Sequence, residues 1–523
     1  MAVSVGKGIL RGAAIISAFA LLGKVLGFGQ KLVISPRFGT GLELDAYTLA
    51  FSSVVFIIGM FPQQLLQPLL PLFMEKREKE GEAAAWRLAG SVCTILIAVL
   101  LVVTVLGMAL APKLAEATSS FKDPKGTLLA GRLVFVMMPA VLFMGLFAFL
   151  TLILQSYKRF APSPLGDTIN KIVLIGCLVA LFGRFGIFSL AIGVVAGSAA
   201  GLVAQVIGLR DKIRQIRFGV HWRDPALKHL FLLMLPLLLP FVIAQVRTVI
   251  DYKFASGMAE GSTSGIFFAR GLVDTLILLG PTALGAAIYP YFSEWAGNRE
   301  ALGDMLMRWL RLMVFIFVPV TLALILLGLP IVQLLFQRGK FTEASVALTV
   351  APFTFYTLGL TIFALEIILM RFYFSVKNTL VPAVIGAACV FVHLGVILLT
   401  RHAMQNSSMA LAATISKGVK VAVMLAWLGF LLPSLQGRKN GLFLLKMTLA
   451  AGGMALAMTM VLRAFPAMEA GEGGGLTRLV RLGLTIGGAG AAGALAFVTV
   501  AFVLKMEETA LLWTFLKKRR PSP

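Results

Sequence analysis

The sequence predicts an all-α membrane protein, and three observations support this fold class. Apolar residues make up 59% of the 523 residues, and the mean hydropathy is +0.93. Only 13% of the residues are charged, whereas soluble domains are typically about 25% charged. Long apolar runs follow one another from end to end of the chain. This pattern excludes a soluble domain that carries a single membrane anchor.

The apolar runs predict about fourteen transmembrane helices, because a helix needs about 20 apolar residues to cross the hydrocarbon core. We expect spans near residues 9–34, 44–73, 86–111, 128–156, 161–183, 186–209, 229–257, 262–292, 308–336, 345–374, 378–400, 406–432, 441–465 and 476–504. The first run is too long for the apolar part of a signal peptide, so we expect no cleavable signal. Cys93, Cys177 and Cys389 lie singly in apolar runs and are interpreted as packing residues.

Alternate loops differ in charge, and this difference predicts the orientation of the chain. With the N-terminus inside, the inside loops and tails hold 21 Lys and Arg residues, and the outside loops hold 8. The longest basic loop, Arg210 to Lys228, carries six of them. By the positive-inside rule, both termini are expected in the cytoplasm. The net charge of +24 is therefore interpreted as topological, and no nucleic-acid partner is expected.

A faint internal repeat predicts two lobes of six spans each. The second and eighth spans end in similar residues, Pro71–Glu75 and Pro290–Glu294, and the fourth and tenth spans end in similar aromatic and basic turns. An even number of spans makes the two halves parallel. We expect an N-terminal lobe at 1–220, a C-terminal lobe at 221–438, and an appendage of two helices with a basic tail at 439–523.

Charged residues inside the apolar runs are the candidate functional residues, because a charge in the bilayer is costly and usually faces a polar cavity. The positive ones are Lys24, Lys31, Arg247, Lys253 and Arg270, and the negative ones are Asp45, Asp251 and Asp274. This set has an excess of two positive charges, which favours an anionic cargo. Lysine and arginine give charge-assisted hydrogen bonds to phosphate oxygens, so a pyrophosphate would neutralise the excess.

Several of these residues are also compatible with a structural role. Lys24 and Lys31 are two helical turns apart and share a helix face, with glycines beside them that permit close helix approach. Arg247 and Asp251, like Arg270 and Asp274, have i,i+4 spacing; each pair either binds substrate or is an internal ion pair, and the sequence leaves both open.

Three further groups of polar residues remain ambiguous. Glu366 is either a carboxylate for a coupling ion or a paired residue. Lys417 and Lys420 either line a cavity or pair with Glu366. His393 is interpreted as a core histidine. No HExxH, GxSxG, Walker or paired-cysteine motif is present, so we expect neither catalytic nor metal-binding residues.

Several motifs resemble the MurJ (MviN) family, the lipid II flippases of the MOP exporter superfamily, over essentially the whole chain. The matching elements are Lys24–Phe28, Asp45–Tyr47, Ala50–Phe51, Arg159–Phe160 with Asn170, Asp251 with Phe254–Ser256, Gly261–Ser264, Pro290 and Phe336–Thr342. The resemblance implies fourteen spans, two six-span lobes and a central cationic cavity with alternating access. It assigns Lys24 to a basic cavity position and Asp45 to the acidic one.

The chain also departs from the family pattern. Gln30 stands where the family usually has an arginine, with Lys31 one step later, and Gly271 stands where the family has another, with Arg270 one step earlier. One step rotates a helical side chain by about 100°. The family's basic pair in the second span has no counterpart around Val54–Ile58. Asn378 and Leu380 replace an acidic and a basic residue near the eleventh span.

Together, the residues and the resemblance predict a flippase for lipid II, the polyprenyl-pyrophosphate-linked peptidoglycan precursor, in the bacterial cytoplasmic membrane. The expected partners are this glycolipid and membrane lipids. No cofactor is expected, and transport would be coupled to the membrane potential or to a monovalent cation.

Three rivals remain. The first is a flippase for another lipid-linked oligosaccharide, of the O-antigen or capsule type. The second is a drug/cation antiporter of the same superfamily, which needs an acidic cavity. The third is a membrane glycosyltransferase or ligase, which needs catalytic groups in a sizeable loop.

Overall fold

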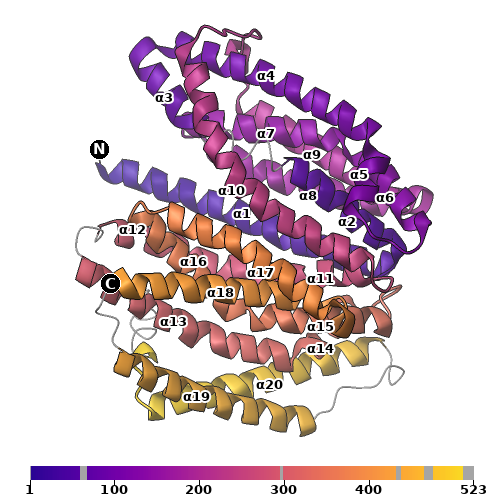
Figure 1. Ribbon diagram of the computed structural model, residues 1–523, viewed down its shortest axis with the longest axis vertical. Helices are drawn as coiled ribbons and strands as arrows, with labels where there is room; N and C mark the ends of the chain where they lie inside the picture. Colours follow the sequence, from indigo (N-terminus) through magenta and orange to yellow (C-terminus); the bar gives the residue numbers. More distant parts are fainter. Residues whose placement is uncertain (1, 59–67, 295–298, 432–436, 465–474, 510–523) are drawn as a thin grey trace. The chain divides into compact units, whose positions relative to one another are not determined.

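The computed structural model describes residues 2–58, 68–294, 299–431, 437–464 and 475–509. These ranges are helical and contain no β-strand, which confirms the predicted all-α fold. By its internal contacts the chain divides into two compact units, Met1–Ser264 and Gly265–Pro523 (Figure 1). This division does not test the predicted domain bounds. The lobes at 1–220 and 221–438 and the appendage at 439–523 stay predictions.

The first unit contains the elements that run from the N-terminus to the start of α11. They are α1 (Ala2–Phe38), α2 (Leu42–Ile58), α3 (Leu69–Glu80), α4 (Glu82–Ala109), α5 (Ala111–Thr118), α6 (Pro124–Met137), α7 (Pro139–Ser156), α8 (Pro162–Phe185), α9 (Phe188–Gly208), the short 3₁₀ turn η2 (Ile213–Gln215) and α10 (Pro225–Ser256).

The second unit contains the remaining elements. They are most of α11 (Ser262–Ile277), the π-helical turn η3 (Leu278–Thr282), α12 (Ala283–Glu294), α13 (Arg299–Leu326), α14 (Gly328–Phe336), α15 (Glu343–Leu358), α16 (Leu360–Ser375), α17 (Leu380–Met404), α18 (Ser407–Leu431), α19 (Gly437–Ala464) and α20 (Gly475–Val503).

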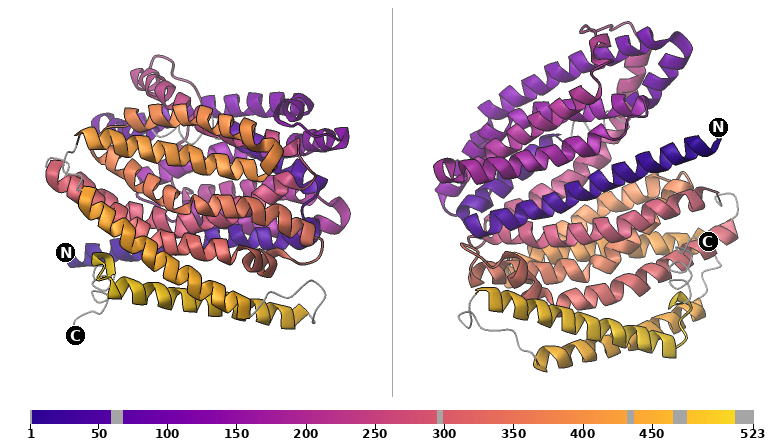
Figure 2. Two further views of the ribbon diagram at one scale, coloured as in Figure 1. Left: turned by 60° about the horizontal axis from the view of Figure 1, so that its bottom comes forward. Right: turned by 180° about the vertical axis from the view of Figure 1, so that it is seen from behind.

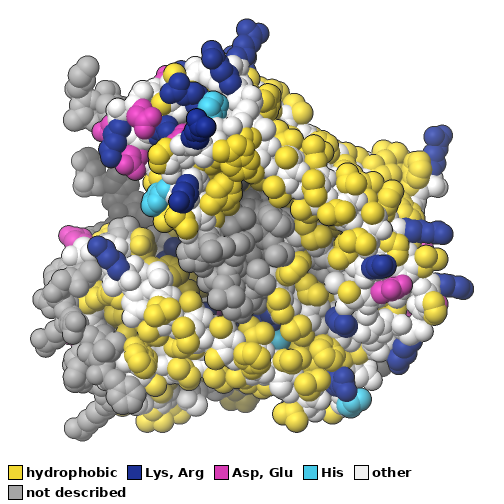
Figure 3. All heavy atoms as spheres, turned by 45° about the horizontal axis from the view of Figure 1, so that its top comes forward, with side chains coloured by type: hydrophobic (Ala, Val, Ile, Leu, Met, Phe, Trp, Pro, Cys, Tyr) yellow, Lys and Arg dark blue, Asp and Glu magenta, His cyan; other side chains and the backbone are white. Residues whose placement is uncertain are grey.

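All fourteen predicted spans overlap helices of the structure. Among the described residues, ten helices are long and apolar enough to cross a membrane, or eleven if α15 and α16, which meet at 44°, form one bent span. Residues 59–67 of the predicted second span lie outside the described residues, and the count of fourteen stays a prediction. On the face drawn in Figure 3, hydrophobic side chains cover much of the surface and charged ones gather in separate groups, as expected where a surface meets lipid.

Glycines bring α8 and α9 into backbone contact. Gly193, Gly197 and Gly201 are four residues apart along α9, so they share one helix face. A Cβ at Gly197 would lie 2.6 Å from the carbonyl oxygen of Asn170, and one at Gly201 would lie 3.0 Å from that of Gly166. Small residues at this spacing let helices approach closely in a membrane, where packing replaces the hydrophobic effect as the driving force.

The last two helices, α19 and α20, pack against other helices of the second unit. Buried methionines of α19, including Met447, Met454 and Met458, form one cluster with Phe497 of α20 and Phe315 of α13. Phe315 and Phe497 have ring centroids 5.2 Å apart. Figure 2 shows α19 and α20 running side by side, which agrees with their extensive contact. The appendage predicted from sequence therefore shares a core with α13 and α14 of its own unit.

The glycine contact between α8 and α9 predicts position-dependent tolerance to larger side chains. Gly197→Val should force α8 away from α9 and lower the free energy of unfolding by about 1–3 kcal/mol, the usual range for overpacking. Gly176→Val is the matched control, because a Cβ at Gly176 of α8 meets nothing within 4 Å. Thermal unfolding in detergent checks this, and equal unfolding midpoints for the two variants would contradict the glycine contact.

Candidate functional site

The first two predicted cations lie on α1, which packs against α8. Lys24 is exposed and Lys31 is half-buried. Beside them, a Cβ at Gly23 would lie 3.1 Å from Oδ2 of Asp167, and one at Gly27 would lie 3.5 Å from Cε of Lys171. The glycines of α1 thus permit the close helix approach that the sequence predicts, and the neighbour is a charged part of α8.

Asp167 and Lys171 on α8 are functional candidates that the sequence analysis missed. Their side chains form an ion pair of 2.5 Å within α8, with exposed fractions of 49% and 19%. The sequence pattern that could have indicated this pair is an acid and a base at i,i+4 spacing inside an apolar run. Because the pair lies beside Gly23 and Gly27, it adds polar groups to the same region as Lys24.

The two predicted i,i+4 pairs differ in what surrounds them. On α11, Nε of Arg270 lies 3.4 Å from Oδ2 of Asp274, with side chains 29% and 60% exposed, so this ion pair forms. On α10, Arg247 is half-buried and Asp251 is only 2% exposed. The pairing of Arg247 with Asp251 stays a prediction.

Asp45 joins two helix N-termini. Its Oδ2 accepts a hydrogen bond of 2.7 Å from the backbone N–H of Gly261, and its Oδ1 accepts one of 2.7 Å from that of Ser264 in the first turn of α11. In return, Oε1 of Glu260 accepts a hydrogen bond of 2.9 Å from the N–H of Leu42, where α2 begins. The first N–H groups of a helix have no partner inside the helix, and a carboxylate suits the positive end of the helix dipole. Asp45 is 2% exposed, so its half of this reciprocal cap is buried, whereas the hydrogen bond from Leu42 to Glu260 is exposed.

Glu366 forms a triad with the two lysines of α18. Its Oε2 lies 2.7 Å from Nζ of Lys417, and its Oε1 lies 2.8 Å from Nζ of Lys420. The Glu366 side chain is 12% exposed, and the lysine ammonium of Lys417 also lies 4.7 Å from the ring centroid of Phe363. The sequence left open whether Lys417 and Lys420 pair with Glu366, and the structure shows that both do. One carboxylate between two lysines leaves one net positive charge near the middle of α16 and α18.

Other residues that the sequence singled out have ordinary surroundings. His393 is fully buried in α17, as expected for a core histidine, and the three cysteines are free thiols. Lys253 is exposed and donates a hydrogen bond of 2.9 Å to the carbonyl oxygen of Ala117. Among the described residues, no three His, Cys, Asp or Glu side chains are grouped so that they could hold a metal ion.

The fold is that of a class of helical membrane transporters. It matches the structure of a lipid II flippase MurJ in an inward closed conformation, with a TM-score of 0.77, 20% identity and coverage of 94% of this chain and 98% of that one. It also matches an inward-facing multidrug resistance MATE family transporter of the MOP superfamily, with a TM-score of 0.60, 13% identity and coverage of 79% and 97%.

The family model described as lipid II flippase MurJ matches residues 34–470. The chain therefore belongs to the lipid II flippase MurJ family, and it is a multi-pass protein of the bacterial inner membrane. A probable lipid II flippase MurJ of Bdellovibrio bacteriovorus is 25% identical over 512 residues, covering 96% of each chain. The lipid II flippase MurJ of Burkholderia cenocepacia is 25% identical over 377 residues, covering 70% of this chain and 73% of its own.

The reciprocal cap predicts that Asp45 matters for stability. Asp45→Ala should strand two N–H groups and lower the free energy of unfolding by about 2–6 kcal/mol, because each buried unsatisfied donor costs about 1–3 kcal/mol. Asp45→Asn should lose less, since an amide oxygen still accepts. Thermal unfolding in detergent measures both, with Glu43→Ala, at an exposed position of the same helix turn, as the control. An Asp45→Ala variant that melts with the parent would refute the cap.

The triad makes a separate prediction. Glu366→Gln should leave two lysines without a counter-charge and destabilise the protein by about 3–5 kcal/mol, the usual result of removing one partner of a buried pair. Replacing all three residues by Leu and Met should recover most of that loss, because no charge then remains. Unfolding midpoints of the single and triple variants provide the measurement. A triple variant less stable than Glu366→Gln would show that the charges do more than neutralise one another.

Proposed function

We propose that this protein translocates lipid II across the cytoplasmic membrane by alternating access, as a transporter that does not hydrolyse its cargo. The main support for this proposal is the excess of positive charge in the membrane-crossing segments. Among the charged residues described above as candidates, eight are cationic and five are carboxylates. The cations are Lys24, Lys31, Lys171, Arg247, Lys253, Arg270, Lys417 and Lys420, and the acids are Asp45, Asp167, Asp251, Asp274 and Glu366.

The cargo's pyrophosphate supplies the missing negative charge. In this proposal Lys24, Lys31, Arg247 and Arg270 bind its oxygens, with the lysines acting as point charges and the arginines as paired donors. Arg270 remains 29% exposed although it pairs with Asp274, so its guanidinium is accessible to a ligand. The polyprenyl tail stays in lipid or in a groove beside the last two helices.

The acidic residues have different roles in this proposal. Asp45 already accepts two backbone hydrogen bonds, so its role is to hold the start of α11 in place. Asp251 and Asp274 position arginines, and Asp251, which is buried, is the carboxylate through which a monovalent cation would be coupled. The membrane potential is the alternative driving force, because moving one charge across the membrane is worth about 2.3 kcal/mol per 100 mV.

A flippase for another lipid-linked oligosaccharide is the second candidate, since the same cations would bind its pyrophosphate. The match to a drug transporter concerns the fold alone, and the net positive charge argues against a cationic drug as cargo. The proposed orientation has both termini in the cytoplasm, and the excess of 21 inside over 8 outside basic residues supports it.

The test is lipid II flipping by the purified protein in vesicles, together with complementation of a bacterium depleted of its own MurJ. Lys24→Ala and Arg270→Ala should each slow flipping at least about tenfold, because a hydrogen bond to a charged group contributes about 1.5–3 kcal/mol. Lys24→Arg should retain more activity, since it keeps the charge. Lys122→Ala, at an exposed cation between α5 and α6, is the control and should flip at the parent rate.

Protein levels in the membrane are measured in parallel, so that lost folding is distinguished from lost binding. If Lys24→Ala and Arg270→Ala are well expressed and flip lipid II at the parent rate, the assignment of these cations to the cargo is wrong. If the parent protein flips another lipid-linked oligosaccharide and not lipid II, the second candidate holds.

A further inference from the structure

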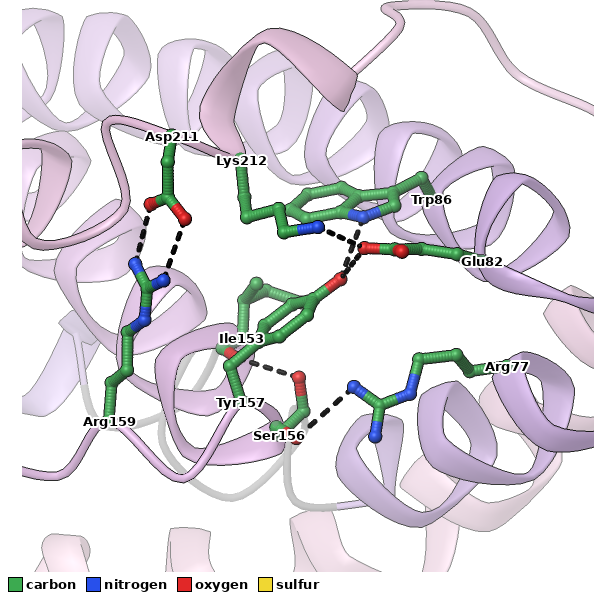
Figure 4. A network of polar contacts seen from close by, with 9 residues as sticks. All are labelled: Arg77, Glu82, Trp86, Ile153, Ser156, Tyr157, Arg159, Asp211 and Lys212. Carbon is green, nitrogen blue, oxygen red and sulfur yellow. Dashed lines mark hydrogen bonds and ion pairs between the residues drawn. The ribbon is translucent and has the colours of Figure 1, made fainter.

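The segment between α9 and α10, residues 209–224, is held in a defined position at both ends. At its start, both carboxylate oxygens of Asp211 accept hydrogen bonds of 2.5 and 2.6 Å from Arg159, and Nζ of Lys212 lies 2.8 Å from Oε1 of Glu82 (Figure 4). The Arg159 guanidinium lowers the pKa of Asp211 to about 2, so this carboxylate stays charged at neutral pH. At its end, Asp224 accepts hydrogen bonds of 2.7 Å from Nζ of Lys76.

These contacts use both acidic residues of the segment and one basic residue, Lys212, and leave its other basic residues outside. Asp211 and Asp224 are both neutralised by cations from other parts of the first unit. Five basic residues in and just after the segment are exposed and form no ion pair with a described residue: Arg210, Arg214, Arg217, Arg223 and Lys228. The outward face of the segment is therefore strongly positive.

The middle of the segment lies against α4. The backbone N–H of Gly219 donates a hydrogen bond of 3.0 Å to Oγ1 of Thr94, and that of His221 donates one of 3.2 Å to Oγ of Ser91. The carbonyl of Arg217 approaches Gly90 so closely that a Cβ there would have no room. Three consecutive contacts thus fix the segment along residues 90–94 of a membrane-crossing helix.

The length of the apolar run in α4 predicts that this contact lies near the headgroups and the first acyl carbons. Arg87 is the last charged residue of α4, and the run from Leu88 to Ala109 has none. That run is about 33 Å long at 1.5 Å per residue, which matches a hydrocarbon core of about 30 Å. Residues 90–94 begin two residues inside the run, so the segment reaches the boundary between water and hydrocarbon.

Two large aromatic side chains project from the segment at this depth. Phe218 is 71% exposed and Trp222 is 72% exposed, although each flanks a residue that is bonded to α4. Aromatic side chains are enriched at membrane interfaces, and basic residues beside them attract anionic lipids. Exposed rings at this depth would meet lipid rather than cytosol.

We propose that the Arg210–Lys228 region is a binding surface for anionic phospholipids of the surrounding bilayer. Phe218 and Trp222 insert among the headgroups, and Arg214, Arg217 and Arg223 bind the lipid phosphates. A membrane fits better than a soluble protein, because the segment is fixed against the lipid-crossing part of α4. The proposal does not depend on the identity of the transported cargo.

The first experiment measures retention of phosphatidylglycerol and phosphatidylcholine by the purified protein with native mass spectrometry. The triple variant Arg214→Gln, Arg217→Gln, Arg223→Gln should bind phosphatidylglycerol less tightly by about fivefold per arginine, since a basic residue near an anionic surface contributes about 1 kcal/mol. Phosphatidylcholine retention should be unchanged. The control variant Lys113→Gln, Lys122→Gln, Arg184→Gln removes three exposed cations elsewhere and should bind like the parent. Equal phosphatidylglycerol binding by the two triple variants would overturn the proposal.

The second experiment locates the rings and does not depend on the arginines. A fluorophore is attached at Phe218→Cys or Trp222→Cys, with Cys93, Cys177 and Cys389 replaced by Ala, in vesicles containing phosphatidylglycerol. Nitroxide lipids labelled near the headgroup should quench both positions strongly, and aqueous iodide should quench them weakly. Glu78→Cys, in the exposed polar end of α3, provides the aqueous reference. Iodide quenching at 218 and 222 as strong as at 78 would overturn the proposal and indicate a surface open to a soluble partner.

Discussion

The cost of an unneutralised charge in hydrocarbon governs how this chain is built. A Lys, Arg or Asp at the centre of a membrane helix costs at least about 2.5–3.5 kcal/mol, and its alternatives are a partner or a water-filled cavity. In the structure, several charged residues of the apolar helices form ion pairs with one another. Asp167 pairs with Lys171, Arg270 pairs with Asp274, and Glu366 lies between Lys417 and Lys420. Even so, more cations than carboxylates remain in the membrane segments, and that remainder is what an anionic cargo would neutralise.

Close packing and capping keep these charges in place. The α9 glycines bring α8 against α9, and α8 in turn carries Asp167 and Lys171 to the α1 glycines next to Lys24. The exchange of caps between Asp45 and Glu260 satisfies N–H groups at two helix starts that would otherwise lack partners. Asp45 and Glu260 thus have a structural task, because their carboxylates accept backbone hydrogen bonds.

The all-α class followed from composition alone, and every predicted span overlaps a helix, because a 20-residue apolar run has few other structures available in lipid. The i,i+4 spacing of Arg270 and Asp274 indicated an ion pair as one of two alternatives, and the structure contains this ion pair. What the sequence could not provide was contact between distant residues. The partners of Asp45 lie 216 and 219 positions away, and the triad joins helices separated by about 50 residues. The Asp167–Lys171 pair has the i,i+4 spacing that indicates an ion pair, so the sequence alone could have predicted it. The Arg210–Lys228 region was recognised as basic, but its attachment to α4 depends on backbone hydrogen bonds that no residue pattern encodes.

The central claim is that the cationic interior recognises the pyrophosphate of a lipid-linked precursor. The most direct measurement compares flipping of two synthetic lipids that carry the same sugar and polyprenyl tail, one linked by pyrophosphate and the other by a single phosphate, in vesicles containing the purified protein. The account predicts faster flipping of the pyrophosphate lipid, with an advantage that shrinks when Lys24 or Arg270 is replaced by Ala, because fewer cations then face the second phosphate. Equal rates for the two lipids, in the parent and in both variants, would contradict it.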